Sequence, residues 1–323
     1  MSKFLIRRLA QVLPMLVGVS IISFSIMHLA PGDPVQLLTS RTASTEEIAR
    51  VRQLYGLDAP VHVQYWRWLS RVAAGDLGRS FVSGRPVLEL ISERLPATLL
   101  LGSVSEILIF AIAVPIGVAA AVRQYSRFDY TVTAASFFGL AMPNFWLAMI
   151  LIYVLAIPLT AIPTSGMMTY GLTIDQAGLL PVLFDRARHL LLPVTVLVTG
   201  GVAAISRYMR SGMLDVLRED YVRTARAKGL RERTVLYRHT LRNALLPVIT
   251  LMGFELSVLL GGTVIVESIF SWPGLGMAAY QAIQQRDYQV VMAFNMMGAA
   301  LLMTGMFAAD VMYALVDPRI RYR

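Results

Sequence analysis

The stretch LAQVLPMLVGVSIISFSIMHLA, residues 9–30, decides the fold class, because it contains no Asp, Glu, Lys or Arg. A helix rises about 1.5 Å per residue and the hydrocarbon core of a bilayer is about 30 Å thick, so this run is long enough to cross it. Lys3, Arg7 and Arg8 precede the run as in a signal peptide, but the run is too long and no small-residue cleavage pattern stands before Pro31. We therefore expect a retained first transmembrane helix.

The composition of the whole chain indicates the same environment. Apolar residues make up 56% of the 323 residues and charged residues only 15%, which exceeds what a soluble core can bury. The chain has no cysteine, so disulfides and thiolate metal sites are excluded. A net charge of +9 would suggest nucleic acid in a soluble protein, but in a membrane chain it reflects loop orientation and anionic headgroups. We expect no nucleic-acid partner.

Further apolar runs complete a prediction of six transmembrane helices with both termini in the cytoplasm, an all-α integral membrane fold. The third run stays uncharged as far as Ile174, but Pro158 and Pro163 should end its helix near residue 158. Most Lys and Arg residues outside one long outer segment fall in segments that this topology places inside, as the positive-inside rule requires. The predicted spans are residues 9–30, 97–122, 131–158, 189–206, 244–266 and 288–309.

These spans divide the chain into four parts: a cytoplasmic N-terminus with the first helix (1–30), an extracytoplasmic cap (31–96), a permease-like core (97–316) and a cytoplasmic tail (317–323). In the cap, a short helix is predicted over residues 61–73. Its rings Tyr65, Trp66 and Trp68 suit the headgroup level of a membrane. The cap is either a lid that merely covers the bundle or a docking platform for a soluble partner.

The longest inner segment, residues 207–243, is here named the knuckle, and its pattern is not required by contact with lipid alone. Acidic residues gather at 215–220, where we expect a helix to begin, since the helix dipole favours negative charge there. Lys228 closes this helix, and Gly229 occupies the position of a left-handed cap. A second helix is predicted over residues 232–241. The knuckle either inserts into a groove of a partner or lies as a basic hairpin on anionic lipid.

Several motifs stand in a fixed order along the chain. They are the Arg7-Arg8 opening, PGDP at 31–34, GDLGRS at 75–80, PNFWL at 143–147, DYVRTARAKGL at 220–230, HTLRNALLP at 239–247, ESIFSWPGLG at 267–276 and DPRIR at 317–321. With these motifs the whole chain resembles the bacterial ABC import permeases of the dipeptide, oligopeptide and nickel branch, in which the knuckle is the coupling loop. Three positions depart from the wider pattern: Arg223 replaces an acid and Arg242 a proline, both as is usual in the peptide branch, and Gln289 stands where relatives often have proline.

The resemblance implies a six-helix pore subunit of a type I importer in the bacterial inner membrane, without catalytic residues. It implies four kinds of partner: the lipid bilayer, a homologous second permease, two ATPases that carry ATP and Mg, and an extracytoplasmic solute-binding protein. The substrate would be a di- or oligopeptide, with nickel or a metal chelate, or glutathione, as alternatives. Residues expected to contact the ATPases are Glu219, Asp220, Tyr221, Arg223, Thr224, Ala225, Arg226, Ala227, Lys228 and Gly229.

Acidic and amide side chains within the spans are candidates for the translocation path, because polar groups in a bilayer are costly and often functional. We name Asn144, Glu255 and Glu267 as candidates for that path. Glu106 and Asp310 also lie within or at the edge of spans, and the sequence assigns them no role.

The sequence holds no signature for chemistry of its own. It has two lysines, Lys3 and Lys228, and neither stands in the Gly-Lys-Ser/Thr context of a phosphate-binding loop, so another chain must bind ATP. The four histidines are scattered, so no metal site is expected. Two rival interpretations are a stand-alone secondary transporter and a membrane-embedded enzyme. The first often has an inverted repeat or a proton-relay pair and the second needs clustered His, Cys or Asp, patterns that we do not find in the sequence.

Overall fold

The computed structural model describes residues 2–29, 57–249, 251 and 263–316, together with isolated positions between 44 and 53. The described chain is built from helices, which confirms the predicted all-α class. The elements are α1 (Ser2–Leu29), α4 (Val61–Ala73), α5 (Val87–Val122), α6 (Arg127–Ala141), α7 (Asn144–Leu151), the π-helix η1 (Ile152–Ala156), α8 (Ile174–Ala177), α9 (Leu179–Leu217), α10 (Asp220–Ala227), α11 (Glu232–Thr234), the π-helix η2 (Val235–Leu241), α13 (Val264–Ile269), α14 (Leu275–Gln284) and α15 (Tyr288–Val316).

Four of the described helices are long and apolar enough to cross a membrane: α1, α5, α9 and α15. A fifth crossing is possible if α6, α7 and η1 are taken together. Residues 250 and 252–262 of the fifth predicted span, 244–266, lie outside the described residues, so the count of six stays a prediction. The helices also run past the predicted spans, since α5 begins at Val87 and α9 continues to Leu217.

The prediction of one helix over residues 131–158 is wrong. The chain bends by 98° between α6 and α7. Met142 adopts an extended conformation (φ −83°, ψ 116°) because the ring of Pro143 disfavours a helical residue before it. The second half ends at Ala156, close to the residue 158 at which the sequence predicts a helix end.

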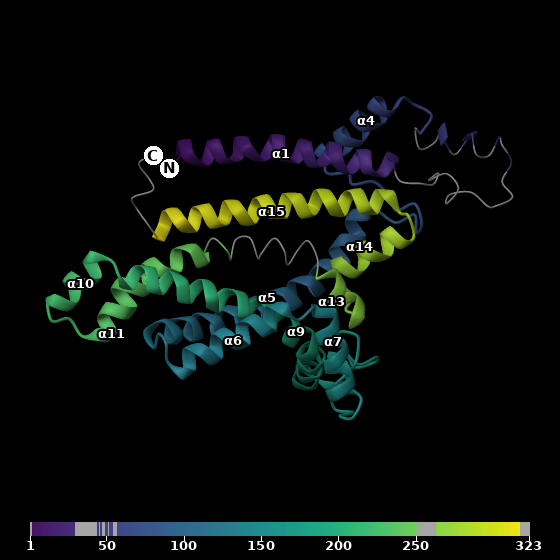
Figure 1. Ribbon diagram of the computed structural model, residues 1–323. Coiled ribbons are helices and arrows are strands. Elements are labelled where there is room, and N and C mark those ends of the chain that lie inside the picture. The colour runs from purple at the N-terminus through teal and green to yellow at the C-terminus, as the bar shows by residue number, and fades with distance from the viewer. Residues whose placement is uncertain are drawn as a thin grey trace.

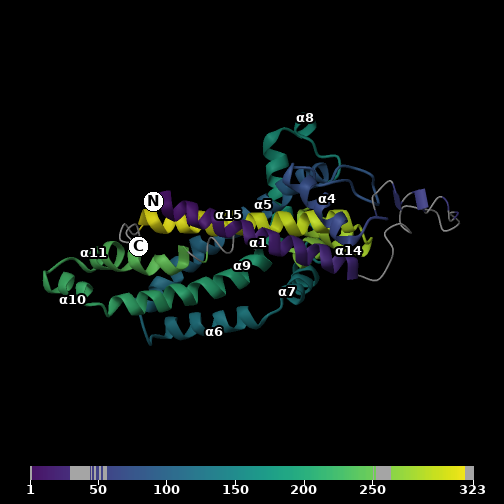
Figure 2. The same ribbon diagram turned by 90° about the horizontal axis from the view of Figure 1, so that it is seen from above.

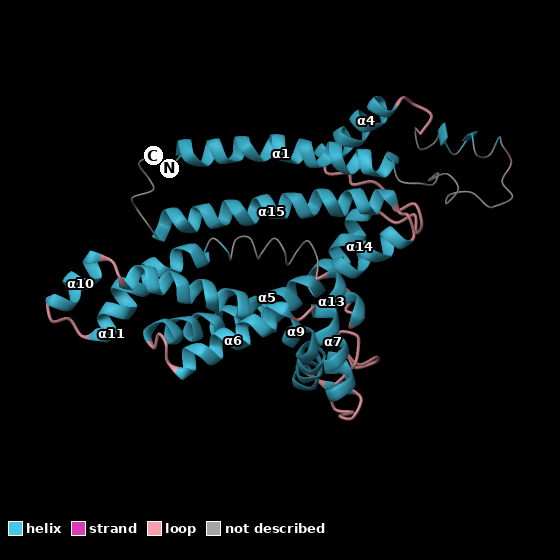
Figure 3. Cartoon of the chain, viewed as in Figure 1, coloured by secondary structure: helices cyan, strands magenta, loops and turns pink. Residues whose placement is uncertain are grey.

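The helices α1 and α15 are antiparallel and lie side by side (Figures 1 and 2). The first turn of α1 and the last turn of α15 lie at the same end of the molecule as α10 and α11 (Figure 1). The helices α4 and α14 lie at the opposite end. The same arrangement coloured by element type shows only short loops between most neighbouring helices (Figure 3).

The centre of the bundle is the contact between α5 and α9, where glycines let the two backbones approach closely. A Cβ atom added to Gly117 would lie 2.6 Å from the Met209 Cβ and 2.7 Å from the Ser206 carbonyl oxygen. Buried Ile109 and Ile205 extend the contact. Such small residues are typical of helix interfaces within membranes, where close packing replaces the hydrophobic effect.

The cap helix α4 packs across the end of α1 and the beginning of α15. Trp68 is 3% exposed and contacts Phe24 and Met292, while the Tyr65 hydroxyl lies 2.8 Å from the Ser20 hydroxyl. Trp66 on the opposite face is 63% exposed. Trp68 is therefore part of the protein interior, and of the three predicted headgroup rings it is the one that protein covers most fully.

Candidate functional site

The knuckle begins with a sharp break after α9. Glu219 has extended backbone angles (φ −67°, ψ 144°), and α10 starts at Asp220. The prediction that Asp215 stands at a helix start is wrong, because it belongs to the last turn of α9. Glu219 and Asp220 do stand at the start of α10, where the helix dipole favours acids.

The end of α10 confirms the predicted left-handed cap. Gly229 has a φ of +74°, a conformation that glycine adopts without a steric penalty. The Gly229 amide donates to the Arg226 carbonyl at 2.9 Å, and the Leu230 amide donates to the Ala225 carbonyl at 3.4 Å. These two bonds form a Schellman motif, which satisfies the last carbonyls of the helix.

Beyond the cap, the chain turns back along α10. Arg226 donates to both carboxylate oxygens of Glu232, at 2.8 and 3.3 Å, across the turn. The second predicted helix starts at Glu232 as expected, but it continues past Leu241 as far as Ile249. The Asn243 amide on this helix donates to the Tyr221 hydroxyl at 2.7 Å. Polar contacts thus hold the two arms of the knuckle together.

A small apolar core lies between these arms. Val222, Ala225 and Val235 are buried and pack together, with Val216 beside them. Ala225 therefore supports the knuckle from within, although the sequence placed it among the contact residues. The rest of the predicted contact set is exposed: Glu219, Asp220, Tyr221, Arg223, Thr224, Arg226, Ala227, Lys228 and Gly229. The result is a firmly supported helix that projects from the bundle (Figure 1) and exposes charged side chains such as Arg223 and Lys228.

The three candidates for the translocation path have different positions. Asn144 is exposed and opens α7 directly after the bend at Pro143. It lies beside α9, since a Cβ atom added to Gly200 would be 3.8 Å from its Oδ1 atom. Glu255 lies outside the described residues. Glu267 belongs to α13 and contacts Thr98 of α5 and Met277 of α14, while its neighbour Val266 packs with Ala148 of α7.

Glu267 is fully buried and serves as an acceptor for three donors. Its Oε1 atom accepts the hydroxyls of Thr98 and Thr263 at 3.0 and 3.1 Å, and its Oε2 atom accepts the Met277 amide at 2.9 Å. Met277 lies in the first turn of α14, where amides have no partner within the helix. The carboxylate therefore caps α14 from outside that helix. The sequence named Glu267 as a candidate for the translocation path, and in the described chain its side chain is enclosed by protein.

The WPGLG motif is shaped around this carboxylate. A Cβ atom at Gly274 would lie 2.5 Å from the Glu267 Oε2 atom, and one at Gly276 would lie 3.0 Å from it. Trp272 is buried and donates from its indole nitrogen to the Ala97 carbonyl at 2.8 Å. Glycine is required at both positions because the acid occupies the space of a side chain.

A second pair of motifs meets where the cap joins α15. Asp287 is buried and accepts the Ser80 hydroxyl and the Phe81 amide, the latter at 3.0 Å. Gln289 donates to the Leu77 carbonyl at 3.1 Å. The sequence quoted GDLGRS and named Gln289, but it gave no indication that these segments touch. Gln289 thus stabilises the cap through a bond that proline could not make.

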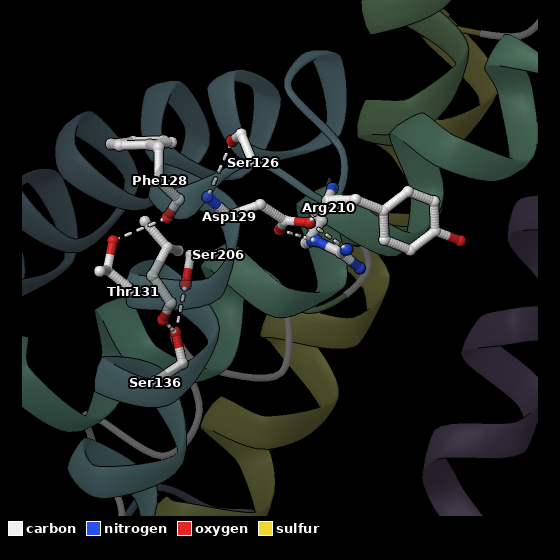
Figure 4. Close-up of polar contacts among 9 residues, drawn as sticks. Ser126, Phe128, Asp129, Thr131, Ser136, Ser206 and Arg210 are labelled. Atoms are coloured by element: carbon white, nitrogen blue, oxygen red, sulfur yellow. Dashed lines mark hydrogen bonds and ion pairs between the residues drawn. The ribbon is translucent and has the colours of Figure 1, made fainter.

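Sequence reasoning also missed an ion pair between α6 and α9. Arg210 donates from Nε to Asp129 Oδ1 at 2.5 Å and from Nη2 to Asp129 Oδ2 at 2.7 Å (Figure 4). The Tyr125 amide donates to the same carboxylate at 3.0 Å. No local pattern could reveal this pair, because the two residues are far apart in the sequence.

Comparison with known proteins agrees with this architecture. Residues 113–322 match the family described as binding-protein-dependent transport system inner membrane component, and residues 1–102 match the N-terminal family of the same components. The oligopeptide transport system permease protein AppB of Bacillus subtilis (strain 168) is 48% identical over 323 residues, and the dipeptide transport system permease protein DppB of Escherichia coli (strain K12) is 39% identical over 338 residues. Both alignments cover 100% of each chain.

A glutathione permease and one solved structure are also similar to this chain. The glutathione transport system permease protein GsiC of Salmonella paratyphi A (strain ATCC 9150 / SARB42) is 38% identical over 323 residues, with 100% of each chain covered. Among solved structures, a chain of the MetNI methionine ABC transporter in an inward-facing conformation matches with a TM-score of 0.54. That match covers 71% of this chain and 97% of the other at 18% identity, so it supports the fold alone.

Proposed function

The chain belongs to the family of inner-membrane components of binding-protein-dependent transport systems, and we propose that it passes short peptides across the bacterial inner membrane. Relatives at 48% and 39% identity are named for oligopeptides and dipeptides, which supports this substrate class. Glutathione is the second candidate, because a relative at 38% identity is named for it and it is itself a short peptide.

The observation that carries the proposal is the knuckle. Its helix α10 is exposed on one side, supported by buried Val222 and Ala225 on the other, and closed by the cap at Gly229. A helix held in this way can enter a groove of a partner and transmit a push without bending. We assign the partner role to two ATPases that bind ATP and Mg, and we assign this chain no catalytic role.

The proposed topology has six spans with both termini in the cytoplasm. It is supported by the position of α10 and α11 at the same end as the start of α1 and the end of α15 (Figure 2). In this topology α4 and α14 face the exterior. A homologous permease pairs with this chain around the path, with Asn144 and Glu255 as the candidate residues for that path.

A solute-binding protein delivers the peptide on the side of α4. A groove there is lined by Arg67, Arg71 and Arg79 together with aromatic residues that include Trp68. These positive charges favour the docking-platform interpretation of the cap, because they can pair with acids on a partner.

The substrate is tested by uptake in cells that carry or lack this chain. We expect cells with the chain to accumulate radiolabelled di- and tripeptides, including glutathione at a lower rate, and to lose that uptake when the chain is deleted. Nickel uptake serves as the control. Loss of nickel accumulation with unchanged peptide accumulation would contradict the proposal.

A further inference from the structure

The ion pair between Asp129 and Arg210 is the most directional contact between α6 and the rest of the bundle. The Asp129 side chain is 3% exposed and that of Arg210 26% exposed. Both carboxylate oxygens are bound by the guanidinium, and the Tyr125 amide adds a third bond. A planar, bidentate pair fixes orientation as well as distance. Its position at the first turn of α6 fixes the inner end of that helix (Figure 4).

From this pair, a seam of small and polar residues continues toward the bend. The Ser136 and Ser206 hydroxyls lie 3.3 Å apart (Figure 4), and a Cβ atom added to Gly139 would lie 3.1 Å from the Ala203 Cβ. Residue numbers rise along α6 as they fall along α9, so the two helices run antiparallel in contact. The seam leads to the bend before α7. It therefore connects the inner end of the bundle to the place where α6 stops.

The same pair stands at the base of the knuckle. Arg210 precedes the end of α9 at Leu217 by about two turns, since a turn holds about 3.6 residues. A Cβ atom added to Gly212 would lie 3.2 Å from the Ala244 carbonyl oxygen, on the returning arm. Both arms of the knuckle therefore meet at the level of the ion pair.

We propose that Asp129 and Arg210 are positioning residues that fasten α6 to α9, so that a displacement of the knuckle reaches the bend at residues 142–144. The inference rests on the proposed function, in which the ATPases move the knuckle. Among the contacts that the described residues make between the two helices, the ion pair is the one that is both charged and bidentate; the others are the hydroxyl contact at Ser136, the close packing at Gly139 and Arg207 over the Phe137 ring, 4.4 Å from its centroid. With Arg210 removed, Asp129 keeps a buried charge without its main partner, which disfavours the aligned position.

The proposal can be tested in the complete transporter, reconstituted in liposomes with its sister permease, ATPases and binding protein. The chain has no cysteine of its own, so cysteines can be introduced at chosen positions. The measured quantity is peptide uptake per ATP hydrolysed. For Arg210→Gln we expect a fall of at least about five-fold, the lower range of coupling between sites. Arg210→Lys keeps the positive charge but loses the bidentate geometry of the guanidinium. Its uptake per ATP hydrolysed should lie between that of the wild type and that of Arg210→Gln. Thr131→Ala on the exposed side of α6 is the matched control and should match the wild type.

A cross-link across the seam separates positioning from mere stability. With Ser136→Cys and Ser206→Cys oxidised to a disulfide, transport should continue in an otherwise wild-type chain, because α6 and α9 move together. The same disulfide should restore the uptake per ATP lost in Arg210→Gln. Failure to form the disulfide in the assembled complex, loss of transport on oxidation, or a wild-type ratio in Arg210→Gln would each overturn the inference. A wild-type complex without ATP-dependent uptake would instead contradict the proposed function.

Discussion

At the scale of single residues, Glu267 shows that the role of an acidic side chain depends on its surroundings in the folded protein. An acid beside a membrane span suggested a group on the translocation path. The structure instead surrounds it with the Thr98 and Thr263 hydroxyls and the Met277 amide, and two glycines make room for it. The motif could be found in the sequence, but its role could not, because the partners come from separate helices.

Glu267→Ala should destabilise the outer end of the bundle. The change leaves the partly buried Met277 amide without this acceptor, which costs roughly 1–3 kcal/mol, and it also empties the space that Gly274 and Gly276 provide. Thermal unfolding of the purified chain in detergent measures the effect. Glu93→Ala is the control, since that acid is half exposed and its pair with Arg85 contributes little. Equal melting temperatures for both variants would contradict the assigned role.

Gly229 is the second residue whose position requires one particular amino acid. Its φ of +74° is strained for any residue with a Cβ atom, while no other atom lies within 4 Å of the space a Cβ would fill. Gly229→Ala should therefore cost about 1–2 kcal/mol through the backbone alone. We expect the variant to assemble but to take up less peptide per ATP hydrolysed.

Gly171→Ala is the matched control for that change. Gly171 has a φ of +81°, equally open surroundings and a place in the loop between η1 and α8, which the proposed topology puts outside the cell. The two variants should show a similar loss of local backbone stability, but only Gly229→Ala should lower uptake per ATP. A similar loss of uptake in both would show that the knuckle has no special part in coupling.

At the scale of elements, the sequence located helices better than their ends. Apolar runs predict where a helix crosses lipid, but α9 continues through charged residues such as Arg188 and Asp215 on both sides of its run. A hydropathy profile does not reveal such extensions, since helix formation outside the bilayer depends on packing. The bend at Pro143 was missed for a different reason: the proline stood within an unbroken apolar run, and composition alone favoured one span.

Contacts between helices make a further prediction. Gly117→Ala should weaken the pairing of α5 with α9, because the new Cβ atom would meet the Met209 Cβ and the Ser206 carbonyl oxygen, neither of which can rotate away. Overpacking of this kind costs about 1–3 kcal/mol. Thermal unfolding with Gly298→Ala as the control checks it, because the space beside Gly298 is open. An unchanged melting temperature for Gly117→Ala would argue against the close contact.

At the scale of the whole molecule, the sequence predicted the class, the family and the knuckle, since each leaves a linear signal. Runs of apolar residues, ordered motifs and a glycine at a helix end can all be recognised in the amino-acid sequence. The links between distant segments leave no such signal. Asp129 with Arg210, and Asp287 with Ser80, became visible only when the helices were placed in space.

The central claim is that the knuckle lies on the cytoplasmic side and meets the ATPases there. It is tested most directly by labelling spheroplasts with a membrane-impermeant maleimide, using Thr224→Cys on the exposed face of α10 and Tyr170→Cys on the outer loop before α8. We predict that the reagent modifies only the Tyr170→Cys chain until the membrane is opened, and that a bifunctional reagent then joins the Thr224→Cys chain to an ATPase. Modification of the Thr224→Cys chain in sealed spheroplasts would contradict the account.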